Sequence, residues 1–569
     1  MTLADFEPLT AAEEAVIAGL GTGHVTVLGD GGLPDPEAGD DRRVRASLIR
    51  WLALGAPGDG DVRLHEHGLQ IAGAMVVSDG QADPVMAGST PGLDLEGCRL
   101  DNDLGLLNCR FNDPPVLRGA RLDTLNLQGA HLPGLQADRL ETRGNVFLHG
   151  VQATGEVRLA GAQIGQNLEC DGGRFENPGG RALNAQGAEV KGAFFWRENS
   201  AAQGALDLTA AEIGRIGDDP ACWPAPGDLL LDRCRYGAFT GHGITADDRI
   251  RWLDLQDPAQ FGQDFWPQPW EHCAHVLREM GHAEDARQLL IAKEERQRRV
   301  RREIESARLA GARLRKRFDT ASDDDTATLQ ACAAEVEAYG STLTHKADPR
   351  GQAFLGQVEK ATRVQVFQWR KQVDDYDALR ARVDAKADRI GTRRADAALA
   401  AQSAVTEAWC KLGFLRLRDW LLAVLIAYGH RPLRALGWLA AMWLFGAVLF
   451  GVVHGNGGFK PNSAFILSKP AWFECAAAGA RRGDHPSTLA CYQAQPEAAG
   501  YPAFNAALYS LDTLVPVVDL EVQDYWVPDE RVSPAARYYL WVHIAMGWFL
   551  ALLAVAGFSG LIDTRATKE

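Results

Sequence analysis

Residues 124–153 read TLNLQGAHLPGLQADRLETRGNVFLHGVQA and repeat one theme. A few alternating apolar residues are followed by a polar residue or glycine, and then by a small residue. From about residue 68 to 240 the small residues recur every 10 to 11 positions, until later insertions stretch the period. A fixed period of this kind indicates stacked repeats. The small residues include Cys98, Cys109, Ala120, Ala130, Val151, Ala162 and Gly173.

The period predicts a right-handed parallel β-helix over residues 66–245. Alternation suits short strands, and a small side chain fits a corner where the coil interior is narrow. Two units per coil give roughly 20 to 22 residues per turn, and stacking the turns buries one continuous apolar column. The repeats resemble a degenerate pentapeptide-repeat β-helix, although they depart from the strict A(D/N)LXX pattern. An antiparallel all-β domain is the alternative, but this stretch contains no Asn-Gly hairpin turn.

Helices are expected on both sides of the repeats. Residues 1–65 read as a helical cap with Thr10 as an N-cap residue. A second helix of this cap is expected to carry Val44, Leu48, Ile49 and Leu52 on one face. Residues 265–299 read as a helical hairpin in which Pro269 suits a helix start and Gly281 a stop. Its histidines, His272, His275 and His282, lack a converging set of carboxylates or cysteines, so no metal site is expected.

A long helical arm is expected over residues 301–410. Its apolar residues recur every three or four positions, which places them on one stripe of a helix. The stripe suits either a solvated arm or a coiled coil between protomers. Its members are Trp369, Val373, Tyr376, Leu379, Val383, Ala387 and Ile390.

Composition excludes several function classes. The 569-residue chain has a formal charge of −15, which argues against a nucleic-acid partner. No cofactor is expected, because no dinucleotide fingerprint follows a strand and no P-loop, GxSxG, HExxH or CxxCH motif is present. The start MTLADFEPLTAAEEAV has no basic region followed by an apolar core, so no signal peptide is expected. These absences argue against an enzyme.

Two apolar stretches, residues 435–454 and 538–562, are long enough to cross a bilayer core of roughly 30 Å. Basic residues precede the first stretch, so the positive-inside rule predicts cytoplasmic termini for a multi-pass inner-membrane protein. Residues 411–434 read as a helix at the inner surface, and residues 563–569 as a cytoplasmic tail. The basic residues are Lys411, Arg416, Arg418, Arg431 and Arg434.

The predicted external loop, residues 455–537, contains a short helix at 503–513 that begins after Pro502 and ends before Pro516. An interfacial helix, a span, a pore-type half-helix, an acidic residue and a second span resemble the two-transmembrane pore domain of the potassium-channel superfamily. The resemblance implies a re-entrant pore helix and filter within ALYSLDTLVPVVDL, residues 507–520. It also implies an oligomer, a tetramer by analogy.

The segment TLVPVVD contains no glycine, which argues against potassium selectivity. Rings of acidic side chains would attract cations instead. The pore and filter candidates are Asp512, Thr513, Leu514, Val515, Pro516, Val517, Val518, Asp519 and Glu521. Cys475 and Cys491 share the same loop; they are either free or, in an oxidising compartment, joined as a disulfide.

The chain is therefore expected to be a multidomain α+β protein: a β-helix, a helical hairpin at 246–300, a helical arm and a two-span domain. The first functional hypothesis is an oligomeric cation channel whose β-helix senses a cytoplasmic protein or small ligand. The second is a membrane-anchored scaffold that does not conduct. The order of the domains also resembles bacterial proteins catalogued as membrane-associated oxidoreductases, which gives the third.

Overall fold

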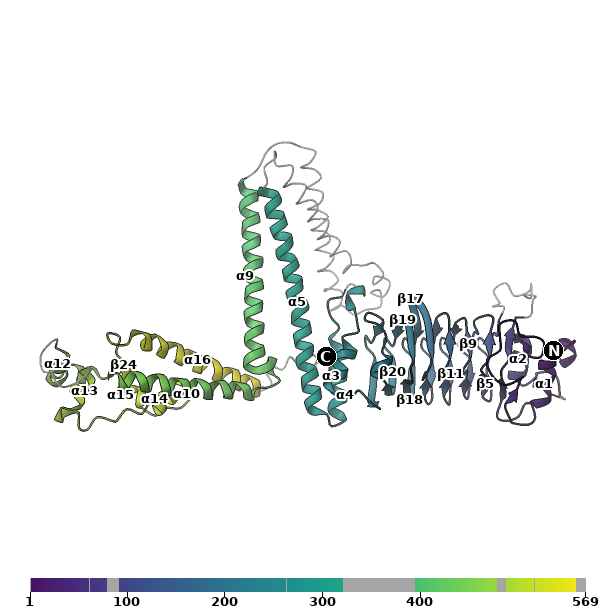
Figure 1. Cartoon of the computed structure of the whole chain (residues 1–569), viewed down its shortest axis with the longest axis horizontal. Helices are drawn as coiled ribbons and strands as arrows, with labels where there is room; N and C mark the ends of the chain where they lie inside the picture. The colour runs from purple at the N-terminus through teal and green to yellow at the C-terminus, as the bar shows by residue number, and fades with distance from the viewer. Residues whose placement is uncertain are drawn as a thin grey trace. The chain divides into compact units, whose positions relative to one another are not determined.

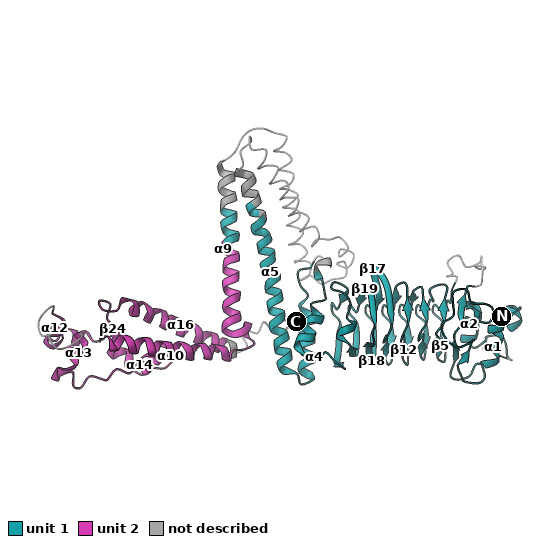
Figure 2. Ribbon diagram, viewed as in Figure 1, with its two compact units in different colours: residues 1–409 teal, residues 410–569 magenta. Residues whose placement is uncertain are grey.

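The computed structural model describes residues 2–60, 62–78, 92–261, 263–320, 395–477, 488–515 and 517–558. The chain divides into two compact units, Met1–Trp409 and Cys410–Glu569, which Figure 2 colours separately. The apolar stripe predicted at 369–390 and the predicted tail at 563–569 lie outside the described residues.

The repeats form a parallel β-solenoid, as the period predicts (Figure 1). Strands that are neighbours in a sheet come from successive turns: Thr142 pairs with Ile164, and Leu135 with Val157, 22 residues further along the chain. All strand pairs of the two solenoid sheets are parallel among the described residues, so the antiparallel alternative is wrong.

One solenoid sheet has twelve strands. They are β1 (Thr26–Val27), β3 (Leu69–Ala72), β5 (Leu104–Leu107), β7 (Arg121–Leu122), β8 (Leu125–Asn126), β11 (Glu141–Thr142), β12 (Val146–Phe147), β15 (Gln163–Ile164), β16 (Leu168–Glu169), β18 (Glu189–Trp196), β20 (Glu212–Asp218) and β22 (Arg235–Thr240). The other sheet has ten. They are β2 (Arg43–Arg45), β4 (Met75–Val77), β6 (Arg110–Phe111), β9 (His131–Leu132), β10 (Leu135–Gln136), β13 (Gln152–Ala153), β14 (Val157–Arg158), β17 (Arg174–Asn184), β19 (Ala201–Asp207) and β21 (Leu229–Leu230).

The residue before each small side chain makes the corner. Gly129 and Gly161 both have φ of 66°, the left-handed conformation that glycine adopts without strain. The next residue closes the turn: the amide of Ala130 donates to the carbonyl of Leu127 (3.1 Å), and its side chain is fully buried. The alternation of glycine and a small residue in the sequence therefore encodes a backbone turn as well as a narrow interior.

The N-terminal cap combines helices and strands. It contains η1 (Leu3–Phe6), α1 (Ala11–Gly19) and α2 (Ala46–Ala53). As predicted, Thr10 caps α1: its hydroxyl accepts from the amide of Glu13 (3.1 Å), and the Glu13 carboxylate accepts from the amide of Thr10 (3.0 Å). The expectation that Val44 lies on a helical face is wrong. Val44 lies in β2 and pairs with Val76, so the cap also supplies the first strands of both sheets.

Helix α4 (Pro267–Glu279) covers the last turn of the solenoid and α5 (Ala283–Thr320) packs against it, forming the predicted hairpin. Gly281 between them has φ of 91°, as expected for a helix stop. Side chains of α4 form hydrogen bonds with backbone amides at the open edge of the sheet, in and beside β22. Gln268 accepts from the amide of Arg233 (2.9 Å), and His272 Nε2 lies 2.8 Å from the amide nitrogen of Tyr236. Preceding these are η2 (Pro220–Cys222), α3 (Ala246–Leu253) and η3 (Pro258–Phe261).

The second unit is built around long helices. Helix α9 (Ala395–Ile426) continues without a break through residues 410 and 411, where the arm and the interfacial helix were expected to separate. After η5 (Ala427–Gly429) the chain forms α10, which begins the apolar part. The remaining elements are α10 (Leu433–Gly455), β23 (Phe459–Pro461), α11 (Ala464–Leu467), α12 (Pro470–Ala476), α13 (Thr488–Gln493), η6 (Pro496–Ala498), α14 (Ala506–Leu514), α15 (Val522–Tyr525), β24 (Trp526–Pro528) and α16 (Pro534–Phe558).

Candidate functional site around helix α14

The short helix α14 begins three residues later than the predicted span 503–513. The side-chain oxygen of Asn505 accepts hydrogen bonds from the amides of Ala507 (3.0 Å) and Leu508 (3.1 Å). Amides at the start of a helix have no partner inside it, so a side chain that accepts their hydrogen bonds stabilises the start of the helix. Asn505 therefore determines where the helix begins.

One side of α14 packs against α10 (Figure 1). The indole Nε1 of Trp443 donates to the carbonyl of Ala507 (2.8 Å), and the hydroxyl of Ser510 donates to the carbonyl of Trp443 (2.8 Å). Gly446 faces the same hydroxyl, and a Cβ there would collide with it. Nearer the start of α14, Ala506 lies against Gly451. The start of α14 thus lies closer to the C-terminal end of α10 than Ser510 does.

The other side of α14 packs against α16 through buried polar groups. His543 is fully buried; its Nε2 lies 3.2 Å from the hydroxyl and 3.1 Å from the carbonyl oxygen of Ser510. Its Nδ1 lies 3.0 Å from the hydroxyl of Tyr539. Four residues further along α16, Gly547 leaves room for the carbonyl of Leu514, with which any Cβ would collide. Two glycines and one histidine therefore seat the helix between α10 and α16.

The carboxylate of Asp512 is turned into the protein and holds the segment that follows α14. Its two oxygens accept from the amides of Leu520 (2.7 Å) and Gln523 (2.9 Å), and only 4% of its surface is exposed. Hydrogen bonds from backbone amides to a buried carboxylate are strong. Asp512 thus closes a loop of the backbone, and both of its carboxylate oxygens have backbone partners within the chain.

The residues after Val515 present a different surface. Val517 is 90% exposed, and Asp519 and Glu521 are also exposed. One oxygen of Asp519 accepts from the amide of Glu521 (3.1 Å). Among the described residues, no group donates to the carbonyls of Val517, Val518 or Asp519. The segment therefore offers two carboxylates and free carbonyl oxygens at one place.

The chain then returns to the end of α10 at which α14 began. After α15, strand β24 pairs antiparallel with β23, which follows α10 directly. Phe459 of β23 and Trp526 of β24 are both buried, in one cluster with Phe450 of α10 and Tyr509 of α14. The loop is thereby closed at its base.

Cys475 of α12 and Cys491 of α13 form a disulfide in this structure. Buried around it are Trp472, Tyr492 and Ala498. The bridge joins α12 to α13, within residues 455–537 and outside the α14 site. Within the described parts of the chain, no group of three or more His, Cys, Asp or Glu side chains could hold a metal ion.

The structure divides the predicted pore residues into two groups. Asp512, Thr513 and Leu514 are buried, and the Thr513 hydroxyl donates to the carbonyl of Tyr509 (2.8 Å). The exposed group comprises Val517, Asp519 and Glu521; Val515 and Val518 lie between them at intermediate exposure, and Pro516 lies outside the described residues.

Sequence reasoning missed Ser510, Trp443 and His543 as partners of the short helix. One signal was available, because His543 is the one ionisable residue in its apolar stretch. An ionisable residue at such a position needs a polar partner inside the protein. The glycines opposite α14 gave no signal of their own, since glycine is common in apolar helices.

Helices α10 and α16 are each long and apolar enough to cross a membrane, by length and composition. Large apolar side chains point outward on both, for example Val448 (67% exposed) and Val555 (65% exposed). Comparison of the chain with protein-family models, curated proteins and solved structures finds no match.

Proposed function

We propose that the chain is one subunit of an oligomeric cation channel in a membrane, with α14 as a re-entrant pore helix. The observation that carries the proposal is the path of residues 505–528. The chain enters as a helix between α10 and α16, reaches Gly547 about halfway along α16, and returns without a span to pair with β23. A segment of this kind is tolerated at membrane depth only where protein or water surrounds its backbone.

The exposed side of the segment supports a conduit at an oligomer axis. Val517 is almost fully exposed in the single chain, and the free carbonyls of residues 517–519 need partners in a membrane. Water and cations along an axis would supply them. A single copy has too few helices to enclose a conduit, so several copies are required, four by analogy with the family that the segment resembles.

The proposal assigns the acidic residues different roles. Asp512 fixes the return loop through the amides of Leu520 and Gln523 and stays out of the conduit. Asp519 and Glu521 are exposed beside the free carbonyls, so rings of these two carboxylates would attract cations. The absence of glycine from TLVPVVD remains an argument against potassium selectivity.

In this proposal the first unit lies in the cytoplasm, because Lys411, Arg416, Arg418, Arg431 and Arg434 precede α10. The solenoid binds a ligand or partner, and α9, which is continuous from Ala395 to Ile426, transmits the change to α10. The backbone between them is strained: Ala427 and Tyr428 have φ of 46° and 57°. This break is the proposed hinge.

The test is conductance of the purified protein in planar bilayers. Wild type should pass cations, and Asp519→Asn should lower single-channel conductance at least about twofold at low ionic strength, where screening is weak. Glu497→Gln, an exposed acid elsewhere in the loop, is the matched control and should leave conductance unchanged. A well-folded wild-type protein that never conducts would contradict the proposal and favour the membrane-anchored scaffold.

A further inference from the structure

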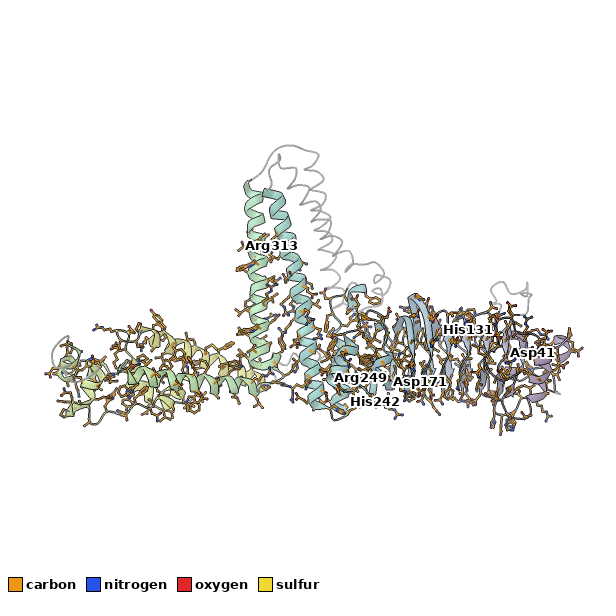
Figure 3. The ribbon with its side chains drawn as sticks, viewed as in Figure 1. Asp41, His131, Asp171, His242, Arg249 and Arg313 are labelled. Carbon is orange, nitrogen blue, oxygen red and sulfur yellow. A yellow bond between two sulfur atoms is a disulfide. The ribbon has the colours of Figure 1, made fainter. Side chains whose placement is uncertain are left out.

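Large apolar side chains are exposed on helix α9 shortly before the first apolar span; Figure 3 draws the side chains of this helix as sticks. Four of them are between 56% and 63% exposed. At about 3.6 residues per turn they fall within a sector of about 140°, and Leu412 and Leu415 on the opposite side are buried. Such side chains are costly to leave in water. The apolar face of α9 comprises Trp409, Phe414, Leu417 and Trp420.

The end of α9 is held against the ends of α10 and α16 at which the spans begin and finish. Leu425 is buried in one cluster with Ala435 of α10 and Ala554 of α16, and the indole of Trp438 donates to the carbonyl of Val424 (3.3 Å). Figure 2 shows the part of α9 that belongs to the second unit running across the direction of α10. A helix placed in this way at the end of a membrane-spanning helix lies along the membrane surface.

Basic side chains lie at both edges of the apolar face. At about 100° per residue, Arg416 lies beside Trp409 and Trp420, and Lys411 lies beside Phe414 on the far edge. Both basic side chains are exposed. Long basic side chains at the boundary of an apolar helix face keep their charge at the headgroups while the apolar side chains enter the acyl region.

The charge around the apolar face is positive. The one acidic residue from 409 to 434, Asp419, is buried and accepts a hydrogen bond from Arg418 (3.0 Å). This surface attracts anionic lipid. It disfavours a second copy of the same face, because the cations would meet like charges with no exposed acid from this stretch to pair with. The basic residues of the stretch are Lys411, Arg416, Arg418, Arg431 and Arg434.

We propose that residues 409–420 of α9 lie in the headgroup layer of an anionic leaflet, with the apolar face toward the acyl chains. Lys411 and Arg416 contact lipid phosphates, and Trp409 and Trp420 occupy the boundary that tryptophan prefers. The inference rests on the membrane-spanning part of the proposed function and does not require conduction. In the proposed channel, the charge of the leaflet would then affect the position of α9 and, through it, the hinge that follows.

The first test is the thermal midpoint of the full-length protein in nanodiscs of phosphatidylcholine, alone or mixed with phosphatidylglycerol. At low ionic strength the wild-type midpoint should be at least about 2 °C higher in the anionic mixture. The double variant Lys411→Gln/Arg416→Gln should lose this difference. Arg174→Gln/Lys191→Gln removes the same kinds of charge from exposed positions of the solenoid and should keep it.

The second test locates the apolar face directly. Cys410, an exposed free cysteine, lies on the same side of α9 and can carry a nitroxide spin label in a Cys332→Ser background. In anionic nanodiscs the label should be more accessible to oxygen than to a water-soluble nickel complex. A label on Lys191→Cys, in a protein that also carries Cys410→Ser, should show the reverse order.

Three results would overturn the proposal. One is an equal wild-type midpoint in the two lipid mixtures, or a difference that persists in the folded Lys411→Gln/Arg416→Gln variant. Another is a Cys410 label that the nickel complex reaches more readily than oxygen, which would leave the face in water. The third is dipolar coupling between Cys410 labels of neighbouring copies together with low oxygen access, which would make the occupant a second copy. None of these measurements depends on whether the protein conducts.

Discussion

The solenoid and the second unit distribute polar and apolar residues in opposite ways. In the solenoid, Leu148 and Val157 are fully buried, and charged residues such as Arg121 lie outside. In the second unit, Val448 and Val555 are exposed. Its fully buried side chains include His543 and Ser510, which join α14 to the long helices.

This difference identifies what stabilises each unit. The stacked turns of the solenoid bury its apolar column away from water, so the hydrophobic effect is enough to stabilise this unit. Two apolar helices in lipid gain nothing from burying apolar side chains against each other, and close packing at small residues and hydrogen bonds must hold them. The second unit, with its glycines opposite α14, has the second kind of interior. Its outer surface is expected to be complete only with lipid or further subunits.

The largest expected effect separates a buried leucine of the solenoid from an exposed leucine of the second unit. Leu148→Ala should lower the free energy of unfolding of the solenoid by about 2 to 5 kcal/mol, because it leaves a cavity in the column. Leu444→Ala, at a position 58% exposed on α10, should have little effect in detergent. Chemical unfolding of the purified proteins, followed by tryptophan fluorescence, measures both. Equal effects of the two changes would contradict the opposite arrangement of the two interiors.

A pair of glycine substitutions tests how α14 packs between α10 and α16. Gly547→Ala should destabilise the second unit by about 1 to 3 kcal/mol, since the new Cβ would collide with the carbonyl of Leu514. Gly437→Ala on α10 meets no atom within 4 Å, so it should be neutral or mildly stabilising. Thermal midpoints in nanodiscs give the comparison. A neutral Gly547→Ala would mean that α14 does not pack where the structure has it.

The smallest expected effect concerns His272 of α4, the helix that covers the last turn of the solenoid. Burial lowers the pKa of His272 below its ordinary value of 6.5. The neutral ring is therefore favoured in the folded state, and its contribution to stability is present above pH 6.5 and lost as the pH falls toward the lowered pKa. His272→Gln should reduce the fall in thermal midpoint between about pH 7 and pH 5. His242→Gln, an exposed control, should follow wild type, and an unchanged pH dependence in His272→Gln would contradict the account.

The solenoid was predictable from sequence because its signal is repeated. Most turns again place a small residue such as Ala130 after a glycine, and partners 22 residues apart follow from the period. Non-repeating pieces were harder to predict. Val44 carries the apolar spacing of a helix, yet it pairs with Val76, and that partner exists only once the solenoid has formed.

The short helix was predictable as an element, while its surroundings were not. Its end was predicted at Thr513, one residue before the observed end at Leu514, but its start depends on the side chain of Asn505. The role of Asp512 depends on amides eight and eleven residues away, and that of His543 on a serine 33 residues earlier. Hydrogen bonds between distant residues leave no periodic trace in a sequence.

The central claim is that residues 517–521, which follow α14, line the axis of an oligomer. Electron microscopy of the protein in nanodiscs tests it most directly, because it yields both the number of subunits and the position of the segment. The account predicts a ring of subunits, four by analogy, with Asp519 facing the axis and α10 and α16 outside it. A monomer or dimer, or a ring in which this segment faces lipid, would contradict it.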